Sequence, residues 1–252
     1  MLNQILENKR CLVVGGAGSI GKAITDAFVE HGAKVVVVDL VSYPMTDKIE
    51  SLPTQRELYS IKGDITKKSQ AEIIVSEATS KLGGHVEILV NAAGIQRRTV
   101  SESFTESDWN DVIAINLSSV FFYSQIVAQD MLKVGYGKII NISSIMSYFG
   151  GVTIPAYSAS KGGVAQLTKA MSNDWVGRGI RVNAIAPGYI DSPMTESIIN
   201  DKTRSEEIVA RTPIGRWGTP EDLKGIAVFL ASRESDFITG AVIPVDGGYS
   251  AR

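Results

Sequence analysis

Three side chains in the middle of the chain have types and spacing that suit proton transfer. Tyr157 and Lys161 are four residues apart where a helix is predicted to begin, so the phenol and the ammonium share one face. A neighbouring cation favours the phenolate and lowers a pKa that is ordinarily about 10, which makes Tyr157 a candidate general acid and base. Ser144 follows a strand-like run at 138–143, where its hydroxyl is placed to hold a substrate oxygen. A Tyr-x-x-x-Lys pair also arises by chance, so the remaining motifs decide its meaning.

A glycine-rich turn near the N-terminus suits a phosphate-containing cofactor. The apolar run 11–14 predicts a strand, and the loop Gly15–Gly21 follows it directly, before apolar residues at helical spacing. In such a strand–turn–helix unit the backbone approaches a pyrophosphate, whose charge is favoured by the helix N-terminus. Asp39 closes the next predicted strand, where a carboxylate accepts hydrogen bonds from the adenosine ribose and repels a 2′-phosphate. These features predict NAD rather than NADP.

The other elements alternate between strands and helices along the whole chain. Further strands are predicted at 57–61, 86–90, 138–142, 180–185 and 241–245, and further helices at 109–131, 157–175 and 220–231. This alternation predicts one α/β domain over residues 1–252, a Rossmann-like doubly wound parallel sheet with helices on both faces. The polar segment 192–217 follows a strand end and is predicted to form a small substrate lid. Asp64 opens a helix, where it can cap the helix and also meet the adenine edge of a cofactor.

Composition excludes several classes of partner. The net charge is −2 with scattered basic residues, which predicts no nucleic-acid partner and no anionic-membrane partner. The N-terminus lacks a signal-peptide pattern, and no run approaches the roughly 18 apolar residues of a membrane span, so we expect a cytoplasmic protein. The single cysteine, Cys11, excludes an internal disulfide, and the distant His31 and His85 predict no metal site.

Together these motifs resemble the classical short-chain dehydrogenase/reductase family over essentially the whole chain. The residues that carry the resemblance are the Gly15–Gly21 loop, Asp64, Asn91-Ala92-Ala93-Gly94, Asn116, Ser144, Tyr157-x-x-x-Lys161, Pro187-Gly188 and Asp246-Gly247-Gly248. Val14 stands where the family usually has threonine, and Ser19 where it usually has glycine. These departures put the affinity for the cofactor in question.

The resemblance implies a role for each matched residue in an NAD-dependent oxidoreductase that forms a homotetramer. Tyr157 would be the general acid and base, and Lys161 would lower its pKa and hold the nicotinamide ribose. Ser144 would orient the carbonyl, Asn116 would support a water in the proton relay, and Ile190 would contact the carboxamide through its backbone. The implied cofactor-binding residues are Gly15, Ser19, Ile20, Gly21, Asp39, Asp64, Asn91, Ala92, Gly94, Tyr157, Lys161, Pro187, Gly188, Ile190 and Ser192.

Within that family the chain is most similar to bacterial dehydrogenases of gluconate-type sugar acids, through residues 93–98, 211–218 and 246–252. This similarity favours a substrate of the 2-dehydro-3-deoxy-D-gluconate or 2-deoxy-D-gluconate class, with oxidation of gluconate at carbon 5 as the alternative. Arginine is the residue best suited to pair with a carboxylate. The candidates to hold the substrate carboxylate are Arg97, Arg98 and Arg216.

Two other classes of function share parts of this pattern. A 3-ketoacyl-carrier-protein reductase would have the same fold and the same tyrosine, but it would usually require NADP, and Asp39 argues against that cofactor. A non-catalytic NAD-sensing module would keep the glycine-rich loop and lose the acid–base group. Asn116, Ser144, Tyr157 and Lys161 are all present, which favours an enzyme.

Overall fold

Short apolar runs rich in valine and isoleucine form one parallel sheet in the computed structural model, which describes residues 4–44 and 57–252. The strands are β1 (Arg10–Val14), β2 (Lys34–Asp39), β3 (Leu58–Lys62), β4 (Ile88–Asn91), β5 (Gly137–Ile142), β6 (Ile180–Pro187) and β7 (Val242–Val245). They lie in the order β3-β2-β1-β4-β5-β6-β7. The winding therefore reverses between β1 and β4, and the crevice beyond their carboxyl ends is where such sheets bind ligands.

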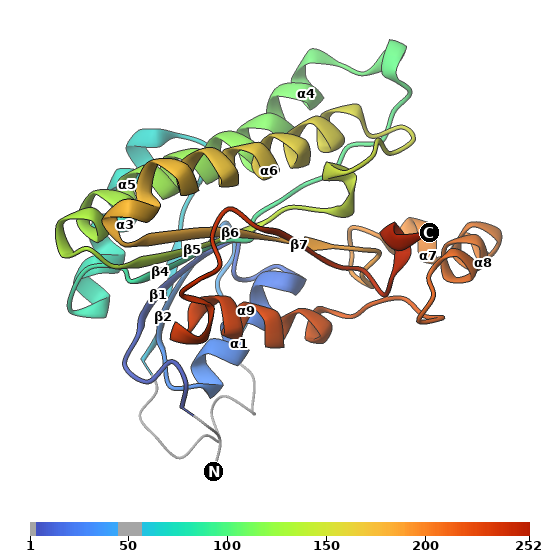
Figure 1. Ribbon diagram of the computed structural model, residues 1–252. Coiled ribbons are helices and arrows are strands. Elements are labelled where there is room, and N and C mark those ends of the chain that lie inside the picture. Colours follow the sequence, from blue (N-terminus) through green and yellow to red (C-terminus); the bar gives the residue numbers. More distant parts are fainter. Residues whose placement is uncertain (1–3, 45–56) are drawn as a thin grey trace.

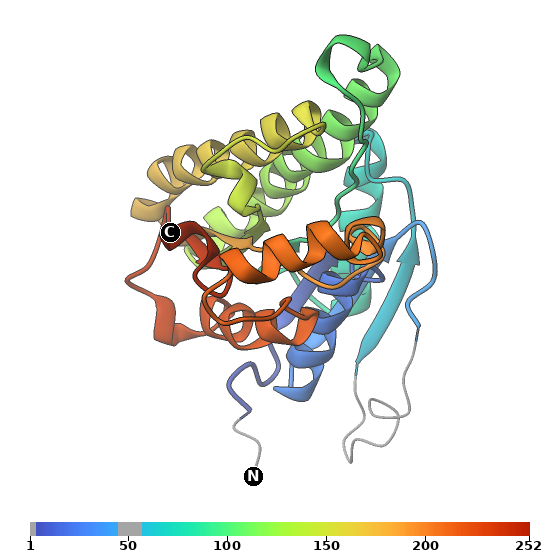
Figure 2. The same cartoon turned by 90° about the vertical axis from the view of Figure 1, so that its right-hand side faces the viewer.

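Helices cover both faces of the sheet (Figure 1). They are α1 (Ser19–Glu30), α3 (Lys68–Leu82), α4 (Glu106–Ile113), α5 (Ser119–Val134), α6 (Pro155–Trp175), α7 (Glu196–Ile199), α8 (Lys202–Arg211) and α9 (Lys224–Ala231). In Figure 1, α3, α5 and α6 lie above the sheet, and α1 and α9 lie below it. The short helices α7 and α8 lie beyond β6, and Figure 2 shows α8 crossing in front of the sheet on that side.

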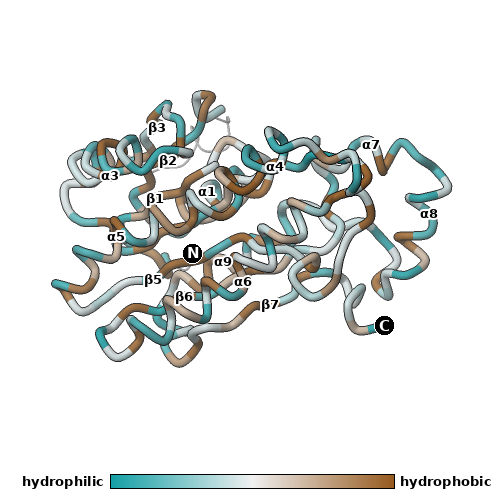
Figure 3. Tube along the Cα trace, turned by 90° about the horizontal axis from the view of Figure 1, so that it is seen from above, coloured by the Kyte–Doolittle hydropathy of each residue, from teal (hydrophilic) through white to brown (hydrophobic). Residues whose placement is uncertain are grey.

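Alternate residues of each strand supply the two cores. In β1, Cys11 and Val13 pack with Phe28 of α1, whereas Leu12 and Val14 pack with residues of α3 and α5 on the opposite face. This division follows from the two-residue period of a strand that is buried on both sides. Figure 3 shows the apolar residues concentrated along the sheet and its covering helices, with hydrophilic residues prominent along α3 and α8.

The predicted fold class is confirmed, and the elements differ from prediction mainly at their ends. The helix α6 begins at Pro155 rather than residue 157, because proline fits the first helical position, where no N–H partner is needed. The predicted helix at 109–131 is interrupted by a π-helical turn, Ala114–Ser118, between α4 and α5. The polar segment 192–217 contains α7 and α8.

The expectation that no segment is apolar enough for a membrane span needs correction. Among the described residues, the continuous helical stretch Glu106–Val134 has a window with a hydropathy of 1.4, which meets that criterion by length and composition. Val120, Tyr123, Val127 and Met131 are nevertheless buried inside the fold. Their packing gives the apolar character of this stretch a structural cause, because a core helix passes the same test.

Candidate active site

Hydrogen bonds fix α6 against the end of β5. Lys161 is 3% exposed, and its Nζ donates to the backbone oxygen of Ile142 at 2.7 Å. The hydroxyl of Ser143 donates to the backbone oxygen of Lys161 at 3.0 Å. Two turns further along α6, Asn141 of β5 donates to the hydroxyl of Thr168 at 2.9 Å. These contacts set the rotation and height of the helix that carries the candidate catalytic pair.

Tyr157 lies beside Ser144, as predicted, but its electrostatics differ from prediction. Burial raises the pKa of Tyr157 above its usual value of 10.0, while a hydrogen bond with Ser144 and the charge of Arg98 act in the opposite direction. Lys161 is not among these causes, and its Nζ is 5.7 Å from the centre of the Tyr157 ring. Burial also lowers the pKa of Lys161 to about 8. The predicted lowering of the Tyr157 pKa by Lys161 is therefore not found, because burial has the largest effect and acts in the opposite direction.

Asn116 is completely buried in the π-helical turn and joins two neighbouring segments. Its side-chain oxygen accepts from the N–H of Ile95 at 2.8 Å, and its Nδ2 donates to the oxygen of Ile95 at 2.9 Å. A further bond from Nδ2 reaches the hydroxyl of Ser160 on α6 at 3.2 Å. A π-turn often marks a functional position. Here it aims Asn116 at the chain beyond β4 and at α6.

The crevice at the sheet's carboxyl edge contains a cleft of about 410 Å³. It is lined by Gly15, Ala17, Gly18, Ser19, Ile20, Gly21, Asp39, Leu40, Val41, Gly63, Asp64, Ile65, Thr66, Ala92, Ala93, Gly94, Ile95, Ile115, Ser192, Pro193 and Met194. A Cβ on Gly21 would lie 2.1 Å from the oxygen of Gly15, so this tight turn requires glycine. Gly18 caps α1 without a side-chain hydrogen bond, which leaves N–H groups available to a phosphate. The cleft fits a dinucleotide.

Most of the predicted cofactor residues line this cleft, and the others are placed differently. Tyr157 and Gly188 line a neighbouring pocket, and Ile190 lines a separate hollow. Asn91 turns its side chain inward, where Nδ2 donates to Ser124 at 3.1 Å and to Asn141 at 2.9 Å. Lys161 and Pro187 are not among the residues that line the cleft, nor is Asn91. The side chain of Asn91 thus has a structural role between β4 and β5, and its predicted role in cofactor binding stays a prediction.

A smaller pocket of about 70 Å³ adjoins the cleft at Met194, which lines both. Its lining residues are Gln96, Arg98, Ser144, Ile145, Met146, Gly151, Val152, Ile154, Tyr157, Gly188, Tyr189, Met194, Thr195, Ile198 and Arg204. The hydroxyls of Ser144 and Tyr157 meet here. A substrate oxygen placed between them would contact both a hydrogen-bond donor and an acid–base group.

The structure places only one of the three predicted substrate arginines in this pocket. Arg98 lines it and is half-buried. Arg97 is exposed and pairs with Asp108 of α4 at 3.3 Å. Arg216 is also exposed, and it forms a two-pronged pair with Asp222 at 2.7 and 2.8 Å. Arg97 and Arg216 therefore lie outside this pocket and have carboxylate partners, and their substrate roles stay predictions that this placement does not favour.

Sequence reasoning missed several residues of the pocket. Tyr189, Thr195 and Arg204 come from the strand end and lid that were predicted to border the site, but no motif marks them individually. Thr195 donates to the oxygen of Ile190 at 2.6 Å and contacts the hydroxyl of Ser192 at 3.2 Å. It therefore holds the turn that connects the cleft to the pocket.

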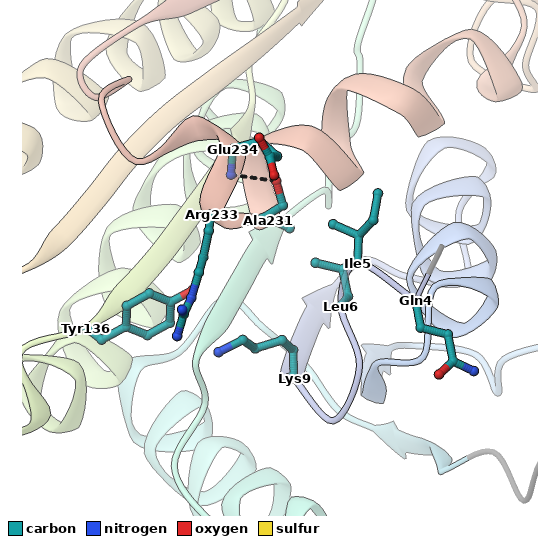
Figure 4. A pocket seen from close by; sticks show the side chains of 9 residues that line it. Gln4, Ile5, Leu6, Lys9, Tyr136, Ala231, Arg233 and Glu234 are labelled. Carbon is teal, nitrogen blue, oxygen red and sulfur yellow. Dashed lines mark hydrogen bonds between the residues drawn. The ribbon is translucent and has the colours of Figure 1, made fainter. Parts of the chain in front are cut away.

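Another cavity, of about 360 Å³, lies away from the cleft and from the hollow at Ile190, at the opposite, amino-terminal edge of the sheet (Figure 4). Figure 4 shows Lys9 and Arg233 pointing toward Tyr136, and Lys9 Nζ lies 4.6 Å from the centre of that ring. Lys9 is paired with Glu87 at 2.9 Å. None of the predicted catalytic or cofactor residues lines this cavity, so it is not the candidate active site.

Comparison with known proteins gives matches over nearly the whole chain. The model of a family described as enoyl-(acyl carrier protein) reductase matches residues 15–250. The chain is similar to 2-dehydro-3-deoxy-D-gluconate 5-dehydrogenase of Bacillus subtilis (strain 168), with 41% identity covering 98% of this chain and 96% of the relative. It is also similar to gluconate 5-dehydrogenase of Gluconobacter oxydans (strain 621H), with 39% identity covering 96% and 95%.

A solved structure extends the similarity to three dimensions. It is a gluconate 5-dehydrogenase from Burkholderia cenocepacia J2315 in complex with NADP and tartrate. The TM-score is 0.90 at 35% identity, and the match covers 100% of this chain and 98% of the other.

Replacing Tyr157 with phenylalanine tests its assignment as the acid–base group. The ring remains while the exchangeable proton is lost, so kcat should fall by roughly 10²–10⁴-fold, the contribution typical of general acid–base catalysis. Stopped-flow measurement of hydride transfer, with calorimetric titration of the cofactor as the control, checks this. Cofactor affinity should be nearly unchanged. A variant that keeps most of its kcat would exclude Tyr157 from the chemistry.

The lowered pKa of Lys161 predicts a pH-dependent stability. The unfolded lysine has a pKa of 10.5 and the folded one about 8, so between these values the unfolded chain binds more protons. The penalty for burying the charge is complete below pH 8 and disappears above pH 10.5. The unfolding free energy of the wild type, relative to Lys161→Met, should therefore rise by about 2 kcal/mol between pH 7.5 and 9.5. Urea unfolding of both proteins measures this, and a constant difference would refute it.

Proposed function

The chain belongs to the short-chain dehydrogenase/reductase family of oxidoreductases, and on that premise we propose that it interconverts a secondary alcohol and a ketone on a gluconate-type sugar acid, with NAD as cofactor. The similarity to the Bacillus subtilis enzyme supports the 2-dehydro-3-deoxy-D-gluconate or 2-deoxy-D-gluconate class of substrate. Oxidation of gluconate at carbon 5 is the alternative, supported by the Gluconobacter oxydans relative.

The placement of Arg98 is the observation that best supports an acidic substrate. Its guanidinium is half-buried in the pocket that contains Ser144 and Tyr157. Its side chain donates to Gln96 at 3.3 Å, and no carboxylate of the described residues lies within 4.0 Å of it. Removing a cation from water without a counter-ion is costly, and a bound carboxylate would offset that cost.

The proposed chemistry uses Tyr157 and Ser144 together. In the oxidation, Tyr157 would first release its own proton to solvent and would then accept the hydroxyl proton of the substrate while Ser144 holds the same oxygen. A bound nicotinamide would supply the hydride chemistry, taking up the hydride that the carbon loses in the oxidation and providing one in the reduction. In the reduction, Tyr157 donates its proton to the carbonyl oxygen. Because burial raises the pKa of Tyr157, this side chain carries its proton at neutral pH, which is the form that reduction requires.

The charges of the cleft support NAD. Among the described residues that line it, the ionisable ones are Asp39 and Asp64, and none is basic. The Asp39 carboxylate accepts from the N–H of Ala17 at 3.1 Å and from its neighbour Leu40 at 2.7 Å. A 2′-phosphate beside this carboxylate would meet a like charge. The Burkholderia enzyme is in complex with NADP, so the proposal for NAD rests on this chain's own acidic residue.

A homotetramer is also proposed, because the resemblance implies one, and sedimentation velocity would measure it. A cytoplasmic location is proposed as well, and cell fractionation would test it.

A substrate screen tests the proposed function and the acyl-carrier alternative that the family description suggests. The panel contains 3-keto-2-deoxy-D-gluconate, 2,5-diketo-3-deoxy-D-gluconate, 5-keto-D-gluconate and acetoacetyl-coenzyme A, each with NADH and with NADPH. We expect kcat/KM to be largest for a sugar keto acid with NADH. A preference for the acyl thioester, or no reduction of any keto acid, would overturn the proposal.

The cofactor preference can be assigned to one charge. Wild-type kcat/KM should favour NAD by about tenfold or more, and Asp39→Asn should narrow the difference by about tenfold, mainly through a lower KM for NADP. This variant keeps the shape of the side chain and removes its charge. Steady-state kinetics with both cofactors measures the ratio, and an unchanged ratio would show that Asp39 does not set the preference.

A further inference from the structure

A second arginine faces the reacting groups from the lid. Arg204 of α8 lines the same pocket as Arg98, Ser144 and Tyr157. Arg98 comes from the chain beyond β4, whereas Arg204 comes from the segment beyond β6 (Figures 1 and 2). The two guanidiniums therefore approach one pocket from separate elements.

Arg98 and Arg204 form a cationic pair that the described residues do not neutralise. No carboxylate among residues 4–44 and 57–252 lies within 4.0 Å of either guanidinium, although Arg97 and Arg216 both have such partners. Burial lowers the pKa of Arg98, and the nearby charge of Arg204 lowers it further. Both arginines also act on Tyr189, whose phenol lies between the strand end and the lid. Like charges in one small pocket repel each other until an anion is placed between them.

Stability of the helix does not explain an arginine at position 204. The first turn of α8 contains Lys202 and Arg204 and no acidic residue, although the partial positive charge of a helix N-terminus disfavours cations. The backbone of this turn is nevertheless well anchored. Asp201 accepts from the N–H of Arg204 at 3.2 Å, and Trp217 Nε1 donates to the hydroxyl of Ser205 at 3.0 Å. The scaffold is fixed, and the guanidinium reaches into the pocket.

We propose that Arg204 and Arg98 together bind the carboxylate of the substrate, each donating to it from its own side of the pocket. This inference rests on the proposed function, because it names the residues that recognise the acid. A carboxylate has two oxygens and can accept from two guanidiniums at once. Bound in this way, the acid neutralises both charges and connects α8 to the chain beyond β4. Arg204 is then a specificity residue that does not touch the reacting carbon.

The test compares Arg204→Gln with Lys202→Gln, a control that removes a charge from the same helical turn. The Lys202 side chain is 90% exposed and does not line the pocket. Each variant is assayed with the keto acid that the wild type reduces best and with the C1 amide of that acid. Arg204→Gln should raise KM for the acid by about ten- to a hundredfold, with little change in kcat or in the kinetics of the amide. Lys202→Gln should change neither.

A double-mutant cycle examines whether the two arginines hold one carboxylate. If they do, Arg204→Gln should raise KM less in an Arg98→Gln background than in the wild type, because the bound acid has already lost part of its contact. Independent effects that multiply would show that the residues act on different groups. Arg204→Lys should recover part of the loss, since it restores the charge without the fork geometry.

A binding measurement separates failure of this inference from failure of the proposed function. Calorimetric titration with tartrate, a dicarboxylate that cannot be oxidised when the cofactor is NADH, should show binding to the wild type with NADH present and at least tenfold weaker binding to Arg204→Gln. If no keto acid is reduced, the proposed function fails, and the titration still decides the role of Arg204. The inference would be overturned if Arg204→Gln raised KM equally for the acid and for its amide. It would also be overturned if tartrate bound equally to the wild type and to Arg204→Gln, or did not bind to the wild type at all.

Discussion

The attachment of α6 to β5 is the constraint on which the site depends. Lys161 is buried with a lowered pKa, and its ammonium is directed to the oxygen of Ile142. Two more hydrogen bonds join the same two elements. Ser143 donates to the backbone oxygen of Lys161, and Asn141 donates to Thr168, two turns further along α6. Buried polar groups lose much when a partner is missing, so these bonds admit essentially one rotation of the helix. That rotation places Tyr157 beside the serine that follows the strand.

Alternation in the sequence was sufficient to predict the sheet, because strands buried on both faces are continuous apolar runs. Asp39 and the Gly15–Gly21 loop could be placed for the same reason, since both follow directly from a strand end. The π-helical turn around Asn116 could not be predicted, because it changes the helical phase without a glycine or proline to mark it. The pattern of apolar residues in the sequence therefore predicts the strands and helices, but it does not predict the direction of every side chain.

The substrate end of the site was less predictable, because it depends on contacts between distant segments. Arg97 and Arg98 are adjacent in a segment without helix, and only the packing of α4 decides that the first pairs with Asp108 while the second enters the pocket. Arg216 lies in the segment 192–217, and only the structure shows that its guanidinium pairs with Asp222 outside the pocket. The pKa of Tyr157 was predicted in the wrong direction, because the sequence shows a nearby cation but not the extent of burial.

The two halves of the candidate site carry opposite charge, and this separation is the physical basis of the selectivity that we propose for each half. The ionisable groups that line the cleft, among described residues, are the carboxylates of Asp39 and Asp64, while the pocket has the guanidiniums of Arg98 and Arg204. An acidic substrate of the proposed kind would be attracted to the end where Tyr157 lies and repelled from the cleft with the two carboxylates. If the cleft holds the adenosine of the cofactor, the same carboxylates would disfavour an additional phosphate on its ribose. On this proposal one distribution of charge would select both ligands and orient them toward each other, without any residue that must contact both.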